Sequence, residues 1–172
     1  NPAISDAIDY EIAELKMYQE QAKSIVNETK AKQLLVALDK TFQKNEMLGA
    51  PRKALIFTES RRTQEYLKNF LQNNGYNGKV VCFNGSNNDE DSKSIYRKWL
   101  SLYAGSKRIS GRTIIDRKQS LVDYFRTDAE IMIATESGAE GINLQFCSLL
   151  VNYDMPWNPQ RIEQRIGRCH RY

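Results

Sequence analysis

The stretch Ile131-Met-Ile-Ala-Thr-Glu-Ser-Gly-Ala-Glu-Gly-Ile-Asn-Leu144 decides the fold of this chain. It opens on a short apolar run, which is typical of a strand that is buried on both faces of a parallel sheet. The polar and glycine residues that follow predict a loop at the carboxyl end of that strand. Ligands of open parallel sheets bind at this edge, so the stretch predicts an α/β fold with a binding loop.

Similar apolar runs predict three further strands, over residues 53–58, 79–83 and 149–153. A helix is predicted from Arg61 to Asn74 with Gly75 as its C-terminal cap, and another is predicted to begin near Pro159. Strands that alternate with helices indicate a parallel sheet with helices on both faces. The strand ends then gather polar residues on one edge: Thr58-Glu-Ser60, Asn84-Gly-Ser86, Thr135-Glu-Ser137 and Asp154.

Residues 1–50 are predicted to form a helical lead-in ahead of an α/β domain over residues 51–172. A second helix is predicted to begin near Asn27 within the lead-in. The segment can be a functional connection to the domain, or it can be a packing arm with no other role. Its residues leave both roles open. The first helix is supported by an apolar stripe at helical spacing, made of Ile8, Ile12, Leu15 and Tyr18.

The composition suits a folded domain, because 41% of the 172 residues are hydrophobic. No apolar run approaches membrane-spanning length, and the N-terminus has neither a signal-peptide pattern nor an initiator methionine, so we expect an excised fragment with no membrane partner. Cys82, Cys147 and Cys169 lack metal-type spacing, so no metal site or disulfide framework is expected. Reduced thiols fit a cytoplasmic protein, nucleoid-associated in a bacterium or nuclear in a eukaryote.

The positive charge of the chain is concentrated in one segment. Residues 93–118 hold eight of the 25 Lys and Arg residues but one of the 21 Asp and Glu residues. Such an excess is typical of a surface that binds nucleic-acid phosphate. We expect Lys107, Arg108 and Arg112, in a loop between two helices of a basic insertion over 87–128, to contact DNA. A solvated or protein-docking loop is the alternative. The aromatic stripe nearby is expected to be structural: Tyr96, Trp99 and Tyr103.

The last thirteen residues, from Gln160 to Tyr172, carry four arginines against one carboxylate. In a helix, Gln164, Arg168 and Arg171 lie at i, i+4 and i+7, on one stripe. Two guanidinium groups beside an amide form a clamp that suits polyphosphate oxygens. Taken alone, the pattern also fits a solvated basic helix.

The order of these motifs resembles the C-terminal motor lobe of superfamily 2 helicases, most closely the Swi/Snf-like branch. The fifth motif of that family is matched over residues 135–143, and an Asp-x-Pro-Trp-Asn-Pro stretch typical of the branch begins at Asp154. The resemblance runs from about Lys53 to the end of the chain. The sixth motif, Gln-x-x-Gly-Arg-x-x-Arg, is matched by Gln164, Gly167, Arg168 and Arg171.

The resemblance implies a RecA-like fold and an ATP site that is shared with an N-terminal RecA-like lobe of the same protein. Arg168 and Arg171 are then arginine fingers, which stabilise charge on the transferred phosphoryl group, and Gln164 positions phosphates or couples the lobes. Gly141, Asn143 and Gly167 are implied to meet nucleotide. Asn143 stands where the DEAD-box branch usually has aspartate, and Gly167 can serve close helix packing instead.

Mg²⁺ is expected to be held by the first lobe, because this chain has no Gly-x-x-x-x-Gly-Lys-Ser/Thr loop and no Asp-Glu-x-His-type motif. The resemblance also implies a nucleic-acid track on this lobe. Four of its implied residues have a structural alternative, which is a helix cap, preferred, for Ser60, a bare turn for Gly85 and Ser86, and a capped turn for Thr135. The implied residues are Thr58, Ser60, Gly85, Ser86 and Thr135.

We therefore expect the second motor lobe of an ATP-dependent DNA helicase or translocase, which acts along duplex DNA and hydrolyses ATP only as part of the full-length protein. The alternative is a non-catalytic nucleic-acid-binding module with vestigial motor motifs. A nucleotide-binding regulatory domain fits less well, because the chain lacks a phosphate loop.

The purified 172-residue chain is expected to show negligible ATP hydrolysis and weak nucleotide affinity, because its sequence lacks a phosphate loop. A phosphate-release assay with and without duplex DNA measures this directly. Robust hydrolysis by the chain alone would rule out a half site.

Overall fold

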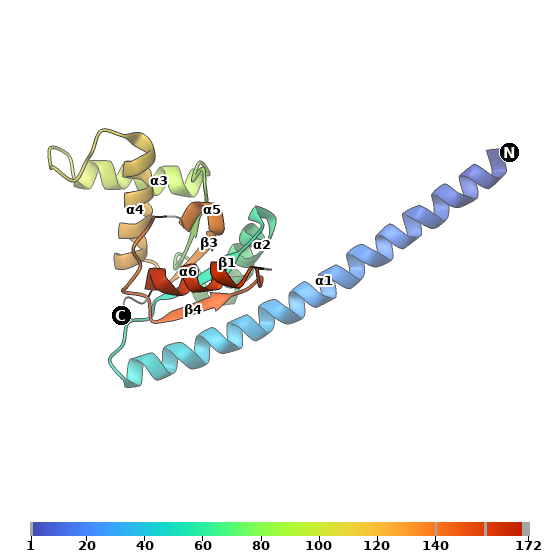
Figure 1. Ribbon diagram of the computed structural model, residues 1–172, viewed down its shortest axis with the longest axis horizontal. Coiled ribbons are helices and arrows are strands. Elements are labelled where there is room, and N and C mark those ends of the chain that lie inside the picture. The colour runs from blue at the N-terminus through green and yellow to red at the C-terminus, as the bar shows by residue number, and fades with distance from the viewer. Residues whose placement is uncertain (1, 140, 157, 170–172) are drawn as a thin grey trace. The chain divides into compact units, whose positions relative to one another are not determined.

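The computed structural model describes residues 2–139, 141–156 and 158–169 (Figure 1). The chain divides into two compact units, residues 1–38 and 39–172. The first unit is helical, and the second contains the sheet and the remaining helices. The boundary falls inside a helix, ahead of position 51, where the sequence predicts that the α/β domain begins.

Helix α1 runs without a break from Pro2 to Met47. The prediction of a second helix beginning near Asn27 is wrong, because Asn27 lies inside α1. No glycine or proline interrupts residues 3–48, so nothing in the backbone chemistry ends the helix there. The nearby hydroxyl of Thr29 donates to the Ile25 carbonyl at 3.0 Å, which satisfies a polar side chain within the helix.

Four strands form one parallel sheet in the order β2-β3-β1-β4. Every residue of β1 and β3 is buried, as expected for strands that are covered on both faces. The predicted α/β class with a parallel sheet is confirmed. The strands are β1 (Ala54–Thr58), β2 (Val80–Phe83), β3 (Ile131–Thr135) and β4 (Leu149–Asn152).

Helix α2 (Arg61–Leu71) covers one face of the sheet with Leu67 and Leu71. Gln64 is also buried, and its amide donates to the carbonyls of Phe83 (3.1 Å) and Ile133 (2.7 Å). A polar side chain can be buried there because both strands supply acceptors. Helix α2 ends at Leu71 with Gln72 at its C-cap, so the predicted end at Asn74 with Gly75 as the cap is wrong. Gly75 lies instead at φ 99° in a π-helical turn over Gln72–Tyr76 that follows α2.

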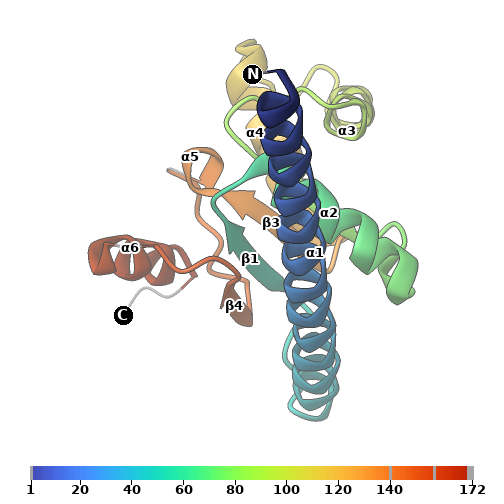
Figure 2. The same cartoon turned by 90° about the vertical axis from the view of Figure 1, so that its right-hand side faces the viewer.

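Helices α3 (Glu90–Leu102) and α4 (Thr113–Thr127) form the predicted helical insertion. Leu121 and Phe125 of α4 lie in the main apolar cluster with Leu55 and Phe57 of β1. These β1 residues point to one side of the strand and Ile56 to the other, so α4 covers the face opposite α2. Helices therefore lie on both faces, as predicted (Figure 2).

The loop between α3 and α4 is held by Asp116, in the first turn of α4. Its carboxylate accepts hydrogen bonds from the hydroxyl (2.6 Å) and the N–H (2.9 Å) of Ser110 and from the N–H of Gly111 (3.1 Å). These bonds, that of the Ser110 hydroxyl above all, lower the pKa of Asp116. The loop between α3 and α4 thus ends in a defined turn just before α4 begins.

Two short elements follow β3 and β4. Helix α5 (Glu136–Ala139) begins directly after β3, and helix α6 (Pro159–Cys169) begins at the predicted proline. Among the residues that the structure describes, no helix combines the length and apolar character needed to cross a membrane.

Helix α5 packs closely against the loop after β2. A Cβ atom at Gly138 would lie 2.6 Å from Asn84 Cα and 2.7 Å from its carbonyl carbon. Backbone atoms cannot move aside as a flexible side chain can. Gly138 is therefore required by the approach of two backbone segments.

Gly138→Ala is expected to lower the free energy of unfolding by about 1–3 kcal/mol, because the added methyl group overpacks the contact with Asn84. Gly167→Ala is the matched control. A Cβ there meets nothing within 4 Å, and alanine favours a helix over glycine by up to about 1 kcal/mol. Urea unfolding of both variants measures the difference, and equal stabilities would contradict the close approach.

Candidate functional site

The carboxyl ends of the strands meet at one edge of the sheet, as predicted. Thr58 pairs in register with Thr135, Phe57 with Asn152, and Ala134 with Phe83. The loops after all four strands therefore begin at the same level, and α5 extends from the tip of β3 (Figure 2). This edge is the candidate functional site.

Thr58 lies inside this edge and does not present its hydroxyl to solvent. It is fully buried and donates to Asp154 Oδ2 at 2.6 Å, while the same oxygen accepts the N–H of Glu59 at 3.2 Å. This bond joins the ends of β1 and β4. A contact between Thr58 and nucleic acid stays a prediction, and the described conformation uses its hydroxyl structurally.

Ser60 caps helix α2, which confirms the preferred structural role of this residue. Its hydroxyl accepts the N–H of Thr63 at 3.1 Å. The next residue, Arg61, is exposed and donates from Nη2 to Ser86 Oγ (2.7 Å) and to Asn84 Oδ1 (3.2 Å). The structure thus brings the loop after β1 and the loop after β2 together through a guanidinium group.

Two asparagines, Asn84 and Asn87, fix the loop after β2. Asn84 Oδ1 accepts the N–H groups of Ser86 (3.2 Å) and Asn87 (2.8 Å), and Asn87 Oδ1 accepts the N–H of Asn84 (2.7 Å). The N–H of Ser86 is therefore engaged within the loop. Gly85 is exposed beside it, and its contact with phosphate stays a prediction.

The last residue of β3 and the segment after this strand supply three predicted site residues. Thr135 is buried, and its hydroxyl has no hydrogen-bond partner among the described residues. Gly141 adopts φ 80°, a conformation that L side chains rarely take, so the turn itself requires glycine. Asn143 is exposed, and its Oδ1 accepts the N–H of Gln145 at 3.1 Å. The amide group of Asn143 is therefore exposed next to the turn at Gly141.

Helix α6 carries the predicted phosphate clamp. Gln164 is exposed, and the backbone of Arg168 lies one turn later in the same helix. Gly167 is also exposed, and open space surrounds it, so close helix packing does not explain this glycine. Arg171 lies outside the described residues, as do the side chains of Arg168 and Cys169. The roles of Gln164, Arg168 and Arg171 stay predictions.

Arg165, which the sixth motif as matched in this sequence does not include, is the most deeply buried of the described side chains of α6. It is 1% exposed and donates from Nη1 to Asn152 Oδ1 (2.8 Å) and the Asp154 carbonyl (3.2 Å). Its Nη2 lies 3.4 Å from Glu136 Oε2, and its guanidinium carbon lies 4.8 Å from the centre of the Phe57 ring. From the sequence alone this arginine can be either solvated or paired, since its burial depends on the fold.

The three cations of the insertion differ in their surroundings. Lys107 and Arg112 are exposed. Arg108 donates to both oxygens of Asp123 (2.9 and 3.1 Å) and lies 4.5 Å from the Tyr103 ring centre. Lys107 and Arg112 therefore remain the stronger candidates for phosphate contacts, whereas Arg108 holds the loop to α4.

The aromatic stripe of the insertion is structural, as expected. Trp99 is 5% exposed and donates from Nε1 to Asp123 Oδ2 at 2.8 Å. Its ring centre lies 6.5 Å from that of Tyr96 and 5.3 Å from that of Tyr103. These rings pack α3 against α4 and are not arranged as separate stacking platforms for bases.

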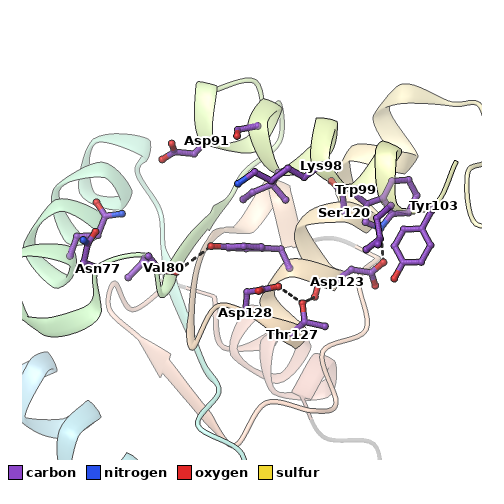
Figure 3. Close-up of a pocket in the computed structure, with 16 residues that line it drawn as sticks. Asn77, Val80, Asp91, Lys98, Trp99, Tyr103, Ser120, Asp123, Thr127 and Asp128 are labelled. Atoms are coloured by element: carbon purple, nitrogen blue, oxygen red, sulfur yellow. Dashed lines mark hydrogen bonds between the residues drawn. The ribbon is translucent and has the colours of Figure 1, made fainter.

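A cavity of about 460 Å³ lies away from this edge, between α3, α4 and the start of β2 (Figure 3). Val80, the first residue of β2, lines it, so it opens toward the amino ends of the strands. Its carboxylates already have partners, since Asp91 pairs with Lys68 and Asp123 accepts from Trp99. The cavity therefore offers no unpaired charged cluster and is separate from the candidate site.

The described residues contain no group of three or more His, Cys, Asp or Glu side chains placed to hold a metal ion. Burial raises the pKa of the Cys82 thiol to about 12, so this thiol stays protonated at neutral pH. Cys147 is buried, whereas Cys82 is half-buried. The donors at the strand-end edge are arginine, amide and hydroxyl groups, which suit phosphate and ribose oxygens.

Comparisons with known proteins agree with this chemistry. Residues 100–172 match the family described as helicase conserved C-terminal domain. The chain is 45% identical over 119 residues to YqhH of Bacillus subtilis, an uncharacterized ATP-dependent helicase, and the match covers 69% of this chain and 16% of that protein. It is 31% identical over 140 residues to helicase swr-1 of Neurospora crassa, covering 80% of this chain and 6% of that protein.

Among solved structures, the chain is similar to the E. coli DEAD-box protein SrmB, in a complex with regulator of ribonuclease activity A. The TM-score is 0.51 at 21% identity, over 84% of this chain and 65% of that chain. This likeness concerns the fold alone. The chain thus spans less than two thirds of each of these proteins, and a small part of the two curated relatives.

Proposed function

We propose, on the premise that this chain is a C-terminal lobe of the Swi/Snf-like branch of superfamily 2 helicases, that it supplies one half of an ATP site. The other half belongs to an N-terminal RecA-like lobe. The observation that carries the proposal is the anchoring of α6 to the strand-end edge, where Arg165 meets Glu136 and Asp154. This places the helix of the sixth motif beside the loop of the fifth.

In this site Arg168 and Arg171 act as arginine fingers, which stabilise negative charge that develops on the transferred phosphoryl group. Gln164 positions the phosphates or couples the lobes. Gly141 and Asn143 approach the nucleotide from the loop after β3, and Gly167 leaves room beside the fingers, in agreement with its open surroundings. Hydrolysis of ATP is then a property of the full-length protein.

Mg²⁺ accompanies ATP in this proposal and neutralises charge on the phosphates when it is bound. We assign it to the first lobe, because hard cations prefer clustered oxygen ligands and the described residues of this lobe place no three carboxylates together. The residues of this lobe contribute cationic and amide donors to the phosphates, and no carboxylate here is assigned a proton-transfer role.

The second ligand in the proposal is duplex DNA, along which the two lobes move. Ser86, beside exposed Arg61, and Gly85 form one phosphate-binding part of the track, with Lys107 and Arg112 as a second part. A non-catalytic nucleic-acid-binding module remains the competing function. The two functions differ in whether α6 affects ATP turnover. The cellular location also stays a prediction. We expect a cytoplasmic protein that is nucleoid-associated in a bacterium, or a nuclear one in a eukaryote.

Arg168→Ala in the full-length protein is expected to lower kcat on the order of 10³-fold while ATP affinity changes little, because arginine fingers act mainly in the transition state. The same result is expected for Arg171→Ala. Steady-state ATPase kinetics and nucleotide-binding titrations separate the two effects. Near wild-type turnover in either variant removes that arginine from the site.

Replacing Lys107 and Arg112 together by alanine is expected to weaken DNA binding across sequences and to lower the log–log salt slope by roughly 0.9 per lost contact. Arg108 is kept, because its removal would also break the Asp123 pair. Binding of the full-length protein to duplex DNA at several salt concentrations measures the slope. An unchanged slope and affinity would assign these charges to solvent or to a protein partner.

A further inference from the structure

Helix α6 is attached to its lobe in an unusual way. Among residues 159–167, whose side chains the structure describes, Arg165 alone is buried. Ile162 is half-buried, and Ile166 is 42% exposed. A surface helix is normally held by an apolar stripe. Here the buried contact is made by a guanidinium group.

A single carboxylate, that of Glu136, receives two arginines of α6. Arg161 Nη1 lies 3.1 Å from Glu136 Oε2, and Arg165 Nη2 lies 3.4 Å from the same oxygen. The two arginines are one turn apart in the helix, so both project from one stripe. Glu136 opens α5, directly after the final residue of β3. The carboxylate therefore connects α6 to the loop of the fifth motif.

The other partners of Arg165 restrict the helix further. Its Nη1 is shared between the Asn152 side chain and the Asp154 carbonyl, and the Phe57 ring lies beneath its guanidinium group. A buried charge is stable only when its partners are kept in place. Since these partners come from β1, β4 and α5, they fix the rotation of α6 about its own axis.

We infer that Glu136, Arg161 and Arg165 are positioning residues, which set the rotation of α6 and thereby the presentation of positions 164 and 168 to the first lobe. The inference rests on the proposed function. Arg161 and Arg165 contact Glu136 of the lobe, whereas Gln164 is exposed on a neighbouring stripe. Loss of the carboxylate removes the counter-charge of buried Arg165, and the helix can then rotate or shift. A misplacement of about 1 Å can reduce catalysis on the order of 10²-fold.

The test uses the full-length protein with three single variants. Glu136→Gln keeps the shape of the side chain and removes its charge, and Arg161→Gln removes the more exposed of the two partners. Glu163→Gln is the matched control, because it makes the same chemical change at an exposed position of α6. We expect Glu136→Gln to lower kcat roughly 10-fold or more, with little change in KM for ATP. Arg161→Gln should lower kcat less, and the control should match the wild type.

A double variant and hydrogen exchange complete the test. Because Glu136 and Arg161 act through the same contact, Glu136→Gln with Arg161→Gln should cost little more than Glu136→Gln alone. Amide hydrogens of α6 should exchange faster in Glu136→Gln, while those of β1 and β3 keep their protection. A merely structural role would instead lower the melting temperature and speed exchange throughout the sheet, and that result would overturn the inference.

The outcomes also distinguish this inference from the proposed function. If Arg168→Ala and Arg171→Ala both keep full turnover, the shared ATP site itself is wrong. If Arg168→Ala lowers kcat but Glu136→Gln retains wild-type kcat and α6 protection, the fingers exist and the positioning role is wrong. Additive losses in the double variant would likewise overturn the shared-carboxylate arrangement.

Discussion

Burial of a parallel sheet on both faces is the constraint on which the rest of this lobe depends. Because α2 covers one face and α4 the other, β1 and β3 must be apolar up to the threonine that ends each strand. Polar side chains can then collect only where the strands end. Parallel pairing in register brings those ends to one edge, so loops that are distant in the sequence become neighbours. The candidate site is a consequence of this packing.

The polar edge is itself held by specific hydrogen bonds. Thr58 joins Asp154, Arg61 joins Ser86, and Arg165 joins β4 to α5 through its two terminal nitrogens. Each bond links two segments that are distant in the sequence, so the edge is held by contacts between segments rather than by independent turns. Removing one member of a hydrogen-bond network can cost more free energy of stabilisation than the sum of its pairwise contacts predicts.

The sequence predicts the strands, the parallel class and the order of the site loops well, because these follow from local apolar runs and glycines. It fails where a residue's environment depends on distant partners. The pattern near Asn27 suggests a helix start, but uninterrupted helix-forming residues continue through it. The contact of Thr58 with nucleic acid stays a prediction, but the sequence gives no sign that its hydroxyl donates to Asp154, 96 residues away. The burial of Arg165 requires Phe57, Asn152 and Glu136, none of which is near it in sequence.

The strand order has a kinetic consequence. Strand β1 occupies the interior of the sheet, yet both of its neighbours, β3 and β4, lie in the last third of the chain. During synthesis β1 therefore emerges long before either pairing partner, with an apolar segment that has no sheet to enter. Sheets dominated by such non-local pairs fold slowly and expose aggregation-prone segments meanwhile. The nascent lobe is consequently most vulnerable in the interval between the emergence of β1 and that of β4.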